Sequence, residues 1–520
     1  AIQVPALPNM DELDKAFTLH RSGELDQAEA AYQHILTQNP NNPDALHLLG
    51  VINFQRENFA QAKDYVANAL QQNADKAEYW NSFADIHLKL KEHESAKKYF
   101  SKALQVQPDY NDALNGLCKT YLETDDFNAL LSLGSHYHQH GELSVAKQIY
   151  STILQHQPRH WSANSFIAEI LKQEDQLDSA RQHYQVAIGQ RPDIAELHNN
   201  LGTILQSQCQ FMDAEQVYRE AIRLKPDYVE AYSNLGTALQ KQLRLQEAIE
   251  TYEAAIAIQP DYADAHWNLS VALLLAGDYA RGWTEYEWRH KAAHKQYLPE
   301  LDKPLWNNED LTGKTILIYP EQGIGDAIQF LRFLPAIKKT NTKIIFACDK
   351  SLLRLMQMHE YIDTVIDFNQ IESQALNYDY HFPLVSLAKV LRINLDNLSS
   401  MPYLSVETEI CNEWQSRIQS TDTKIGIIWG GNPKQPENHF RSFMPDILTN
   451  LSDLKGIQLY SLQKGPAETQ IQMTPDSLNM INLSEHIHDF ADTAAAMLQM
   501  DLIITVCTST AHLAGALGIP

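Results

Sequence analysis

The sequence is poor in cysteine and has no long apolar run. Five cysteines occur in 520 residues, an odd number without any C-x-x-C spacing, which argues against both a disulfide framework and a zinc site. They are Cys118, Cys209, Cys348, Cys411 and Cys507. No apolar stretch approaches the roughly 20 residues of a membrane-spanning helix, and the first residues lack the basic-then-apolar pattern of a signal peptide. A cytoplasmic protein without a membrane span is therefore predicted.

Positive charge is also scarce: the sequence has 41 Lys and Arg residues and 65 Asp and Glu residues, which gives a net charge of −24. Phosphate backbones need clustered cations, so nucleic acid is not expected as a partner. The motif Asp-x-Asp, which would chelate a metal–diphosphate, does not occur in the sequence. The histidine cluster HYHQH at 136–140 contains no carboxylate or cysteine, and it is predicted to be a solvated turn between helices rather than a metal site.

Several residue types recur with one common period, which is the period of about 34 residues that is typical of tetratricopeptide repeats. The series are Pro158, Pro192, Pro226 and Pro260; Ala180, Ala214 and Ala248; Tyr184, Tyr218 and Tyr252; Ala187, Ala221 and Ala255; and Gly202 and Gly236. Small residues at fixed places and a closing proline complete the tetratricopeptide pattern of paired helices. The small residues allow two antiparallel helices to approach closely, and the proline ends the second helix.

The same spacing extends to both sides of these repeats. Backwards it reaches Pro40, Ala74 and Pro108, and forwards it gives a last repeat from Ala263 to about Gln296 that contains Gly282 and Tyr286. The interval from Pro108 to Pro158 is longer than one repeat by about half a repeat, which predicts an extra, unpaired helix near 111–126. The pattern as a whole predicts an all-α superhelix of about eight repeats over residues 1–296. Its concave groove suits an extended peptide or another protein.

After residue 297, short apolar runs alternate with helical stretches. The strand candidates are Ile316–Tyr319, Lys343–Ala347, Thr364–Ile366, Asp379–Pro383, Ile425–Trp429, Gln458–Ser461, Met480–Leu483 and Leu502–Val506. The helix candidates are Ala327–Lys338, Leu352–Met358, Glu407–Gln419, Met444–Leu451, Asp489–Met500 and Thr510–Leu517. This alternation indicates parallel sheets with crossover helices. A boundary at Ile393–Tyr403, rich in Asn and Ser, predicts two Rossmann-like halves, 297–403 and 404–520, that face one another across a cleft.

The stretch KTILIYPEQGIGDAIQFLRF (314–333) predicts a buried strand, a glycine turn and a helix. That order places backbone N–H groups at the carboxyl end of a strand, where open α/β sheets bind ligands. The dinucleotide spacing G-x-G-x-x-G is absent. Gln322, Gly323 and Gly325 are the candidate binding residues of this turn. Asp326 is either the cap of the helix or a catalytic base at the mouth of the cleft.

Three loops of the second half are expected at one edge of its sheet. The first ends in Arg441 and Ser442, the second contains Gln463, Lys464 and Gly465, and the third leads through Thr508, Ser509 and Thr510 into a helix that carries His512. The N–H groups and hydroxyls of such a helix start suit a diphosphate, and two of the loops bring a cation. Ordinary helix capping and solvated surface charges are the alternative interpretation.

Seven segments carry a resemblance to a known family. GWTEYEWR (282–289), PEQGIGDAIQFLRF, IIWGGNP, RSF, SLQKG, HDFADTAAAMLQMDLIITV and STAHLAGALG follow the order seen in bacterial proteins that join tetratricopeptide repeats to a heptosyltransferase-like glycosyltransferase domain. The architecture is also similar to that of the O-linked N-acetylglucosamine transferases. The resemblance covers nearly the whole chain. It implies a GT-B fold that binds a nucleotide-sugar mainly with its second half and transfers the sugar with inversion, without a metal or other cofactor.

The resemblance also implies roles for individual residues. Asp326 matches the general base proposed for heptosyltransferases, and Arg441 matches a cation near the leaving diphosphate. The Thr508–His512 segment matches the diphosphate-binding helix start of the family. Should Asp326 be only a cap, Glu321 and His512 are the next candidates for the base.

The sequence departs from the family pattern in three places. Cys507 stands where an Asp usually precedes the first Thr, and His439 stands where an acidic residue is usual two positions before Arg-Ser. The chain ends at Pro520, before the strand and helix that normally complete a GT-B second half. The second half is therefore expected to be truncated.

Three hypotheses for function remain after these observations. The first is a nucleotide-sugar-dependent glycosyltransferase whose repeats recruit a protein or peptide acceptor. The second is a non-catalytic scaffold with a degenerate transferase-like domain, which Cys507 favours and the intact Asp326 and Arg441 oppose. The third is a transferase for a glycolipid or polysaccharide, which the absence of a basic amphipathic helix disfavours. The sugar, the nucleotide, the acceptor and self-association into a homo-oligomer stay open.

Overall fold

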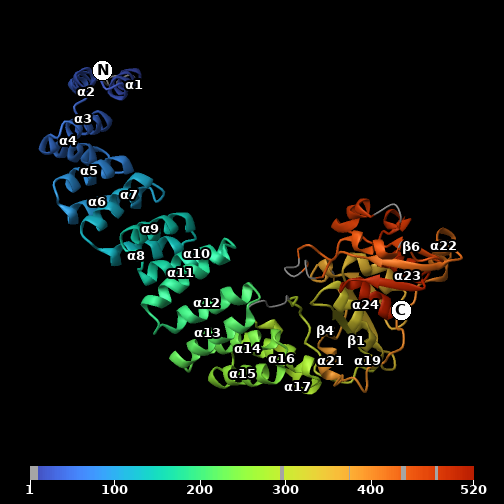
Figure 1. The fold of residues 1–520 in the computed structure, drawn as a ribbon. Coiled ribbons are helices and arrows are strands. Elements are labelled where there is room, and N and C mark those ends of the chain that lie inside the picture. Colours follow the sequence, from blue (N-terminus) through green and yellow to red (C-terminus); the bar gives the residue numbers. More distant parts are fainter. Residues whose placement is uncertain are drawn as a thin grey trace. The chain divides into compact units, whose positions relative to one another are not determined.

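The computed structural model of the protein describes residues 10–292, 298–373, 375–434, 438, 441–451, 453–474 and 478–520. Its contacts divide the chain into two compact units, Ala1–Pro226 and Asp227–Pro520. The first unit consists of helices, and the second contains further helices followed by two sheets (Figure 1). This division falls inside the repeats, and the domain boundaries predicted after residues 296 and 403 stay predictions.

The first unit is built from α-helices of 12 to 14 residues joined by short turns. They are α1 (Met10–Arg21), α2 (Leu25–Gln38), α3 (Pro43–Gln55), α4 (Phe59–Gln72), α5 (Ala77–Lys89), α6 (His93–Val106), α7 (Asn111–Glu123), α8 (Phe127–Gln139), α9 (Leu143–His156), α10 (Trp161–Gln173), α11 (Leu177–Gln190), α12 (Ala195–Ser207) and α13 (Phe211–Leu224). Most pack as successive pairs, from α1 with α2 to α12 with α13.

Small residues bring the two helices of each pair together. The alanines at one repeated position of the second helices, Ala28, Ala62, Ala96, Ala146, Ala180 and Ala214, are all fully buried. Gly202 of α12 shows how close the helices are, because a Cβ atom there would lie 2.4 Å from the ring of Tyr218 in α13. Gly134 of α8 faces Tyr150 of α9 in the same way. The predicted packing role of these small residues is confirmed.

Helix α7 stands outside the pairing. It occupies the stretch in which the spacing predicts an extra helix, and it packs against α5 and α6. Its Gly116 leaves room for the ring of Phe100 in α6, which a Cβ atom would approach to 2.3 Å. Helix α8 packs chiefly with α9 instead of α7.

The prediction of a turn at 136–140 is wrong. His136 and His138 lie in the last turn of α8, and His140 is its C-cap, with its Nδ1 atom 2.8 Å from the carbonyl oxygen of His136. Histidines are compatible with the negative end of a helix dipole. The helix therefore continues to Gln139, and Gly141, with a φ of 81°, follows its C-cap.

The second unit begins with the last repeats. They comprise α14 (Val229–Lys241), α15 (Leu245–Ile258), α16 (Ala263–Ala276), the short α17 (Tyr279–Glu285) and a 3-10 helix η1 (Tyr286–His290). Gly236 of α14 accommodates the ring of Tyr252 in α15, at the same repeated positions as in the first unit. Trp283 of α17 donates from its indole Nε1 to the carbonyl oxygen of Ile393 at 3.0 Å, which attaches the last repeat to the α/β region.

Two four-stranded parallel sheets follow, with the strand orders β3-β2-β1-β4 and β7-β6-β5-β8. The strands are β1 (Thr315–Tyr319), β2 (Lys343–Cys348), β3 (Thr364–Asp367), β4 (Tyr380–Pro383), β5 (Thr423–Ile428), β6 (Ile457–Ser461), β7 (Ile481–Asn482) and β8 (Leu502–Thr505). All eight predicted strands are confirmed. The loops that leave the carboxyl ends of β1, β5, β6 and β8 are those to which a site is assigned from the sequence.

Most of the connecting helices are shorter than the pattern predicts, whereas the last of them begins one residue earlier than predicted. They are α18 (Ile324–Phe330), α19 (Leu334–Ile337), α20 (Leu353–Gln357), α21 (Leu387–Val390), α22 (Thr408–Arg417), α23 (Phe490–Met497) and α24 (Ser509–Leu517). The helix predicted over Ala327–Lys338 is interrupted by a 3-10 turn at Leu331–Phe333, because Pro335 has no N–H to continue the α-helical ladder. The stretch predicted as a helix at Met444–Leu451 is a 3-10 helix, η6 (Pro445–Leu451).

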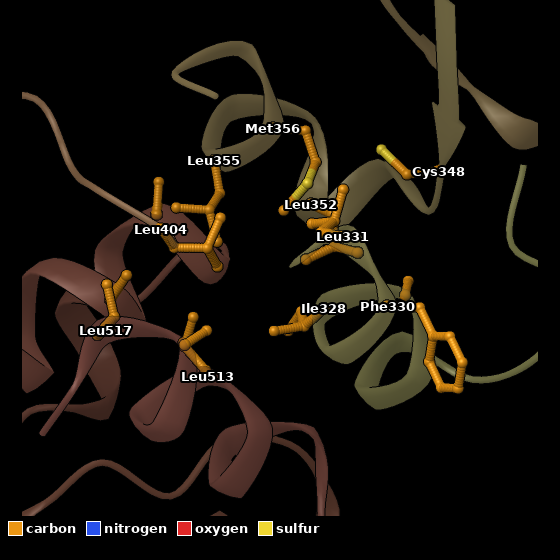
Figure 2. Close-up of a cluster of buried hydrophobic side chains, with 14 of the residues drawn as sticks. Ile328, Phe330, Leu331, Cys348, Leu352, Leu355, Met356, Leu404, Leu513 and Leu517 are labelled. Carbon is orange, nitrogen blue, oxygen red and sulfur yellow. The ribbon is translucent and has the colours of Figure 1, made fainter. Parts of the chain in front are cut away.

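One hydrophobic core extends through the helices of both α/β halves. Figure 2 shows Ile328 of α18 facing Leu513 of α24, and Leu331 and Leu517 belong to the same buried cluster. All four side chains are buried, and α18 packs against α24. The burial of apolar surface therefore holds these two helices together.

Candidate functional site

A cavity of about 650 Å³ is lined by loops from the carboxyl edges of both sheets. Ten of the twelve predicted site residues line it: Gly323, Gly325, Asp326, Arg441, Gln463, Lys464, Thr508, Ser509, Thr510 and His512. Gln322 and Gly465 do not. The amide of Gln322 donates to the hydroxyl of Tyr286 at 2.7 Å, and Gly465, with a φ of 83°, forms the turn ahead of the 3-10 helix η7 (Pro466–Met473).

Asp326 faces the cavity from the first turn of α18. Its Oδ2 accepts a hydrogen bond from the backbone N–H of Gly323 at 3.2 Å, so the carboxylate also caps the helix. Burial raises the pKa of Asp326 above its ordinary value, while His512 and Arg441 act in the opposite direction. A carboxyl group with a raised pKa is better matched to proton transfer near neutral pH. Capping and acting as a base are therefore compatible at this position.

His512 of α24 lines the cavity and lies against the glycine turn. A Cβ atom at Gly325 would lie 2.8 Å from Cδ2 of His512 and 3.3 Å from Cα of Ser509. Glycine is thus required for the close approach of α18 and α24. Burial lowers the pKa of His512, although Asp326 opposes that shift. Burial thus favours the neutral imidazole, which has one donor and one acceptor nitrogen.

The loop after β5 is held in place by the buried amide of Gln463 and the hydroxyl of Ser442. Gln463 is only 2% exposed, and its Oε1 accepts hydrogen bonds from the N–H groups of Trp429 at 3.0 Å and Gly430 at 2.8 Å. The hydroxyl of Ser442 accepts from the N–H of Gly431 at 3.1 Å. These bonds show that Gln463 shapes the cavity wall through the loop.

The two predicted cations of the site differ in their partners. Arg441 is exposed and places its Nη2 3.6 Å from the thiol sulfur of Cys507. Lys464 donates to the carbonyl oxygen of Ser484 at 2.8 Å and lies 3.5 Å from Glu468. The ammonium group of Lys464 is therefore held by the protein itself, whereas Arg441 presents its charge to the cavity.

The start of α24 carries a chain of hydroxyl groups. Thr508 is the N-cap residue, and its hydroxyl lies 2.7 Å from that of Thr510, which lies 2.9 Å from that of Thr505. Cys507 lies one residue before this N-cap. The absence of the family's usual Asp at position 507 therefore does not remove the N-cap of α24. His439, the other departure from the family pattern, lies outside the described residues.

Part of the cavity wall is not foreseen from the sequence. It comprises Ser351, Asn432, Asn438, Ile487, His488, Asp489, Phe490 and Thr493. Asp489 caps α23 by accepting from the N–H groups of Ala491 and Asp492, and Arg354 of α20 donates to the same oxygen at 3.0 Å. An Asp before an apolar helical stretch is a recognisable N-cap signal. Only the fold shows that this helix start faces the cavity.

The described residues contain neither a metal-binding cluster nor a membrane-spanning helix. Among those residues, no three His, Cys, Asp or Glu side chains are grouped so that they would hold a metal ion. None of the described helices combines the length and the apolar character needed to cross a bilayer.

Comparison with known proteins identifies the helical part. Models of the tetratricopeptide repeat match residues 19–86, 77–110 and 131–194, and a TPR repeat model matches residues 210–242 and 244–277. The chain therefore contains tetratricopeptide repeats, as the periodic spacing of its proline, alanine and tyrosine residues predicts.

Similarity to individual proteins is more distant. Protein FlbA of Caulobacter vibrioides is 25% identical in an alignment of 273 positions, and the match covers 48% of this chain and 46% of that protein. The chain thus matches about half the length of this curated relative. Two crystal structures of MamA match 30% and 33% of this chain and 92% and 98% of their own, with 20% and 19% identity. Their TM-score of 0.29 is too low to define the fold further.

Proposed function

We propose that the cavity binds a nucleotide-sugar and that the protein transfers its sugar to a protein or peptide acceptor. The observation that carries this proposal is the shared cavity of Asp326, Arg441 and the start of α24. It combines a group that accepts a proton with two groups that stabilise a diphosphate. Such a combination suits the transfer of a sugar from a nucleoside diphosphate.

The diphosphate is proposed to lie between Arg441 and the N-terminus of α24. This helix spans nine residues, and a helix N-terminus favours negative charge through its N–H groups and dipole. The hydroxyls of Thr508 and Thr510, hydrogen-bonded to one another, lie at this helix start, and the guanidinium of Arg441 supplies a full positive charge. Gly430 and Gly431 of the turn after β5 also line this cavity, and a Cβ atom at Gly431 would lie 2.6 Å from Asn438 and 3.3 Å from Thr508.

Asp326 is proposed to be the general base. It would take the proton of an acceptor hydroxyl as that oxygen forms a bond to the anomeric carbon of the sugar. The bond from that carbon to the phosphate oxygen breaks at the same time, and inversion follows from attack on the opposite face. The electron pair leaves with the nucleoside diphosphate, whose new charge Arg441 and α24 stabilise.

The repeats are proposed to recruit the acceptor. Stacked helix pairs of this kind present extended surfaces that bind peptides and proteins. For this reason we place the acceptor among proteins rather than glycolipids. The competing hypothesis, a scaffold that has lost its donor site, makes the opposite prediction for the experiment below.

The test is a thermal-shift screen of the full chain with UDP-, GDP-, ADP- and CMP-linked sugars. A ligand at about 100 times its dissociation constant adds about 2.7 kcal/mol to the free energy of unfolding. We expect one nucleotide class to raise the melting temperature, and Arg441→Gln to weaken its binding at least about 10-fold. The matched control is Arg417→Gln on α22, where the arginine pairs with Glu413 at 2.6 Å. A scaffold without a donor site would show no shift with any of these ligands.

A further inference from the structure

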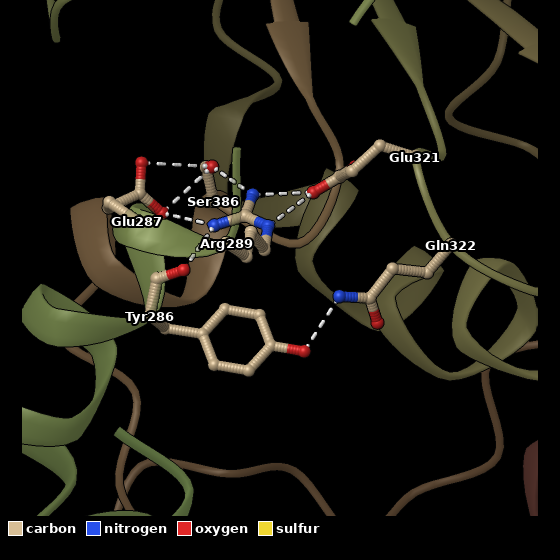
Figure 3. A network of polar contacts seen from close by, with 6 residues as sticks. All are labelled: Tyr286, Glu287, Arg289, Glu321, Gln322 and Ser386. Atoms are coloured by element: carbon tan, nitrogen blue, oxygen red, sulfur yellow. Dashed lines mark hydrogen bonds and ion pairs between the residues drawn. The ribbon is translucent and has the colours of Figure 1, made fainter. Parts of the chain in front are cut away.

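The last repeat uses its periodic tyrosine differently from the repeats before it. Tyr184, Tyr218 and Tyr252 occupy the same position in successive repeats and are at most 2% exposed. Tyr286 continues the series, but it lies in η1 rather than in a regular second helix. Its hydroxyl accepts a hydrogen bond from the side-chain amide of Gln322 at 2.7 Å (Figure 3). The repeat thus contacts the loop that leads from β1 to α18.

Arg289, three residues further along η1, makes a second contact with the same loop. It is 1% exposed, and its guanidinium donates to one carboxylate oxygen of Glu321 from Nε at 3.1 Å and from Nη2 at 2.5 Å. The guanidinium also donates to a carboxylate oxygen of Glu287 at 2.8 Å and to the hydroxyl oxygen of Ser386 at 2.7 Å (Figure 3). Because the charge of Arg289 is buried, it has to keep these partners, which fixes the position of Glu321.

These two contacts lie next to the candidate base in the chain. Glu321 and Gln322 directly precede Gly323, and the N–H of Gly323 donates to Asp326. A short covalent and hydrogen-bonded path therefore connects the last repeat with the carboxylate in the cavity. The ring of Tyr286 packs near those of Trp267 and Trp283, so the tyrosine is itself held by the repeat.

We infer that Tyr286 and Arg289 are positioning residues for Asp326, and that the last repeat is thereby a part of the catalytic framework. The catalytic part of this inference rests on the proposed function. The structural part of the inference, that η1 holds residues 321–326 in place, is independent of the proposed function. A displacement of about 1 Å in a reacting group is enough to cost about 100-fold in rate. A loss of the contact at Gln322 should therefore slow the chemical step without weakening the binding of the donor.

Tyr286→Phe removes one hydroxyl and leaves the ring in place. In the full chain, we expect amide hydrogen exchange of residues 322–326 to become at least about 10-fold faster. We also expect about a 10-fold lower kcat for release of the nucleoside diphosphate, with the dissociation constant of the donor unchanged within about twofold. The matched control is Tyr252→Phe, because the hydroxyl of Tyr252 contacts Gln240 and Thr237 within the repeats. The control should leave both the exchange and the kcat at their original values.

The outcomes separate the inference from the proposed function. If the amide hydrogens of residues 322–326 exchange as slowly in Tyr286→Phe as in Tyr252→Phe, the inference is overturned, whatever the kcat of the variant. If exchange accelerates but the unmodified protein binds no nucleotide-sugar, the structural part holds and the proposed function fails. Arg289→Lys is the second variant, since it keeps the charge and loses the fork of donors. It should accelerate exchange at Glu321 and Gln322, and unchanged exchange there would contradict the inference as well.

Discussion

Two carboxylates that are close in the sequence show how surroundings decide the role of a residue. Glu321 and Asp326 are five positions apart, and both are candidates for the base from the sequence. The Glu321 side chain has no exposed surface and is paired with Arg289. Asp326 instead lines the cavity, and its hydrogen bond comes from a backbone N–H. Glu321 is thereby committed to the framework, which leaves Asp326 as the better candidate for proton transfer.

The buried position of Asp326 leads to a pH-dependent effect on stability. Because its pKa is raised in the folded protein, folding favours the protonated form. The stability that this group contributes is complete below about pH 4, and it is lost as the pH rises through the raised pKa. Asp326→Asn resembles the protonated form, so its advantage in the free energy of unfolding should grow from pH 4 to pH 7. Urea titrations at pH 4, 5.5 and 7 measure this difference, and a constant difference would contradict it.

At the scale of elements, the repeats are specified by close contacts between small residues and rings. Gly202→Ala should lower the free energy of unfolding by about 1–3 kcal/mol, because its Cβ atom would overlap the ring of Tyr218. Gly189→Ala in α11 is the control, since nothing lies within 4 Å of a Cβ atom there. That change should stabilise the protein by up to about 1 kcal/mol through helix propensity. Equal effects of the two substitutions in urea denaturation would show that helix contact is not the cause.

The sequence predicts elements well where one physical period dominates. The repeat period is sufficient to predict the helix pairs, and the buried apolar runs are sufficient to predict all eight strands. It predicts short helices less well, because Pro335 changes the hydrogen bonding of its turn locally. Likewise, ten of the twelve candidate residues line one cavity, but Gln322 points to Tyr286 instead. A contact between segments so far apart in the chain depends on tertiary packing, which no local pattern contains.

At the scale of the whole molecule, the compact units do not coincide with the change in sequence pattern near residue 297. The second unit begins at Asp227, so the last repeats belong with the α/β region by their contacts. This arrangement agrees with the buried pair of Arg289 and Glu321. It also means that the repeats are divided between two units, of which the first contains α1 to α13.

Two truncated chains test this division. Residues 227–520 should give one cooperative thermal transition and bind the donor like the full chain. They should keep release of the nucleoside diphosphate but lose transfer to a protein acceptor if the first unit helps to recruit it. Residues 297–520 lack Arg289, so Glu321 loses its ion pair and the loop at 321–326 loses its contacts with η1, and this chain should melt at a lower temperature. Equal melting temperatures of the two truncated chains would contradict this account.

The most direct test of the central claim is turnover by Asp326→Asn. With the nucleotide-sugar that gives the largest thermal shift, we expect release of the nucleoside diphosphate to fall about 100-fold or more, while the dissociation constant of the donor stays within about twofold. Asn retains the capping bond to Gly323, so the helix start is preserved. Asp126→Asn, at the cap of α8, is the matched control and should keep full turnover. Turnover at the original rate in Asp326→Asn would show that Asp326 only caps α18 and would contradict the proposed mechanism.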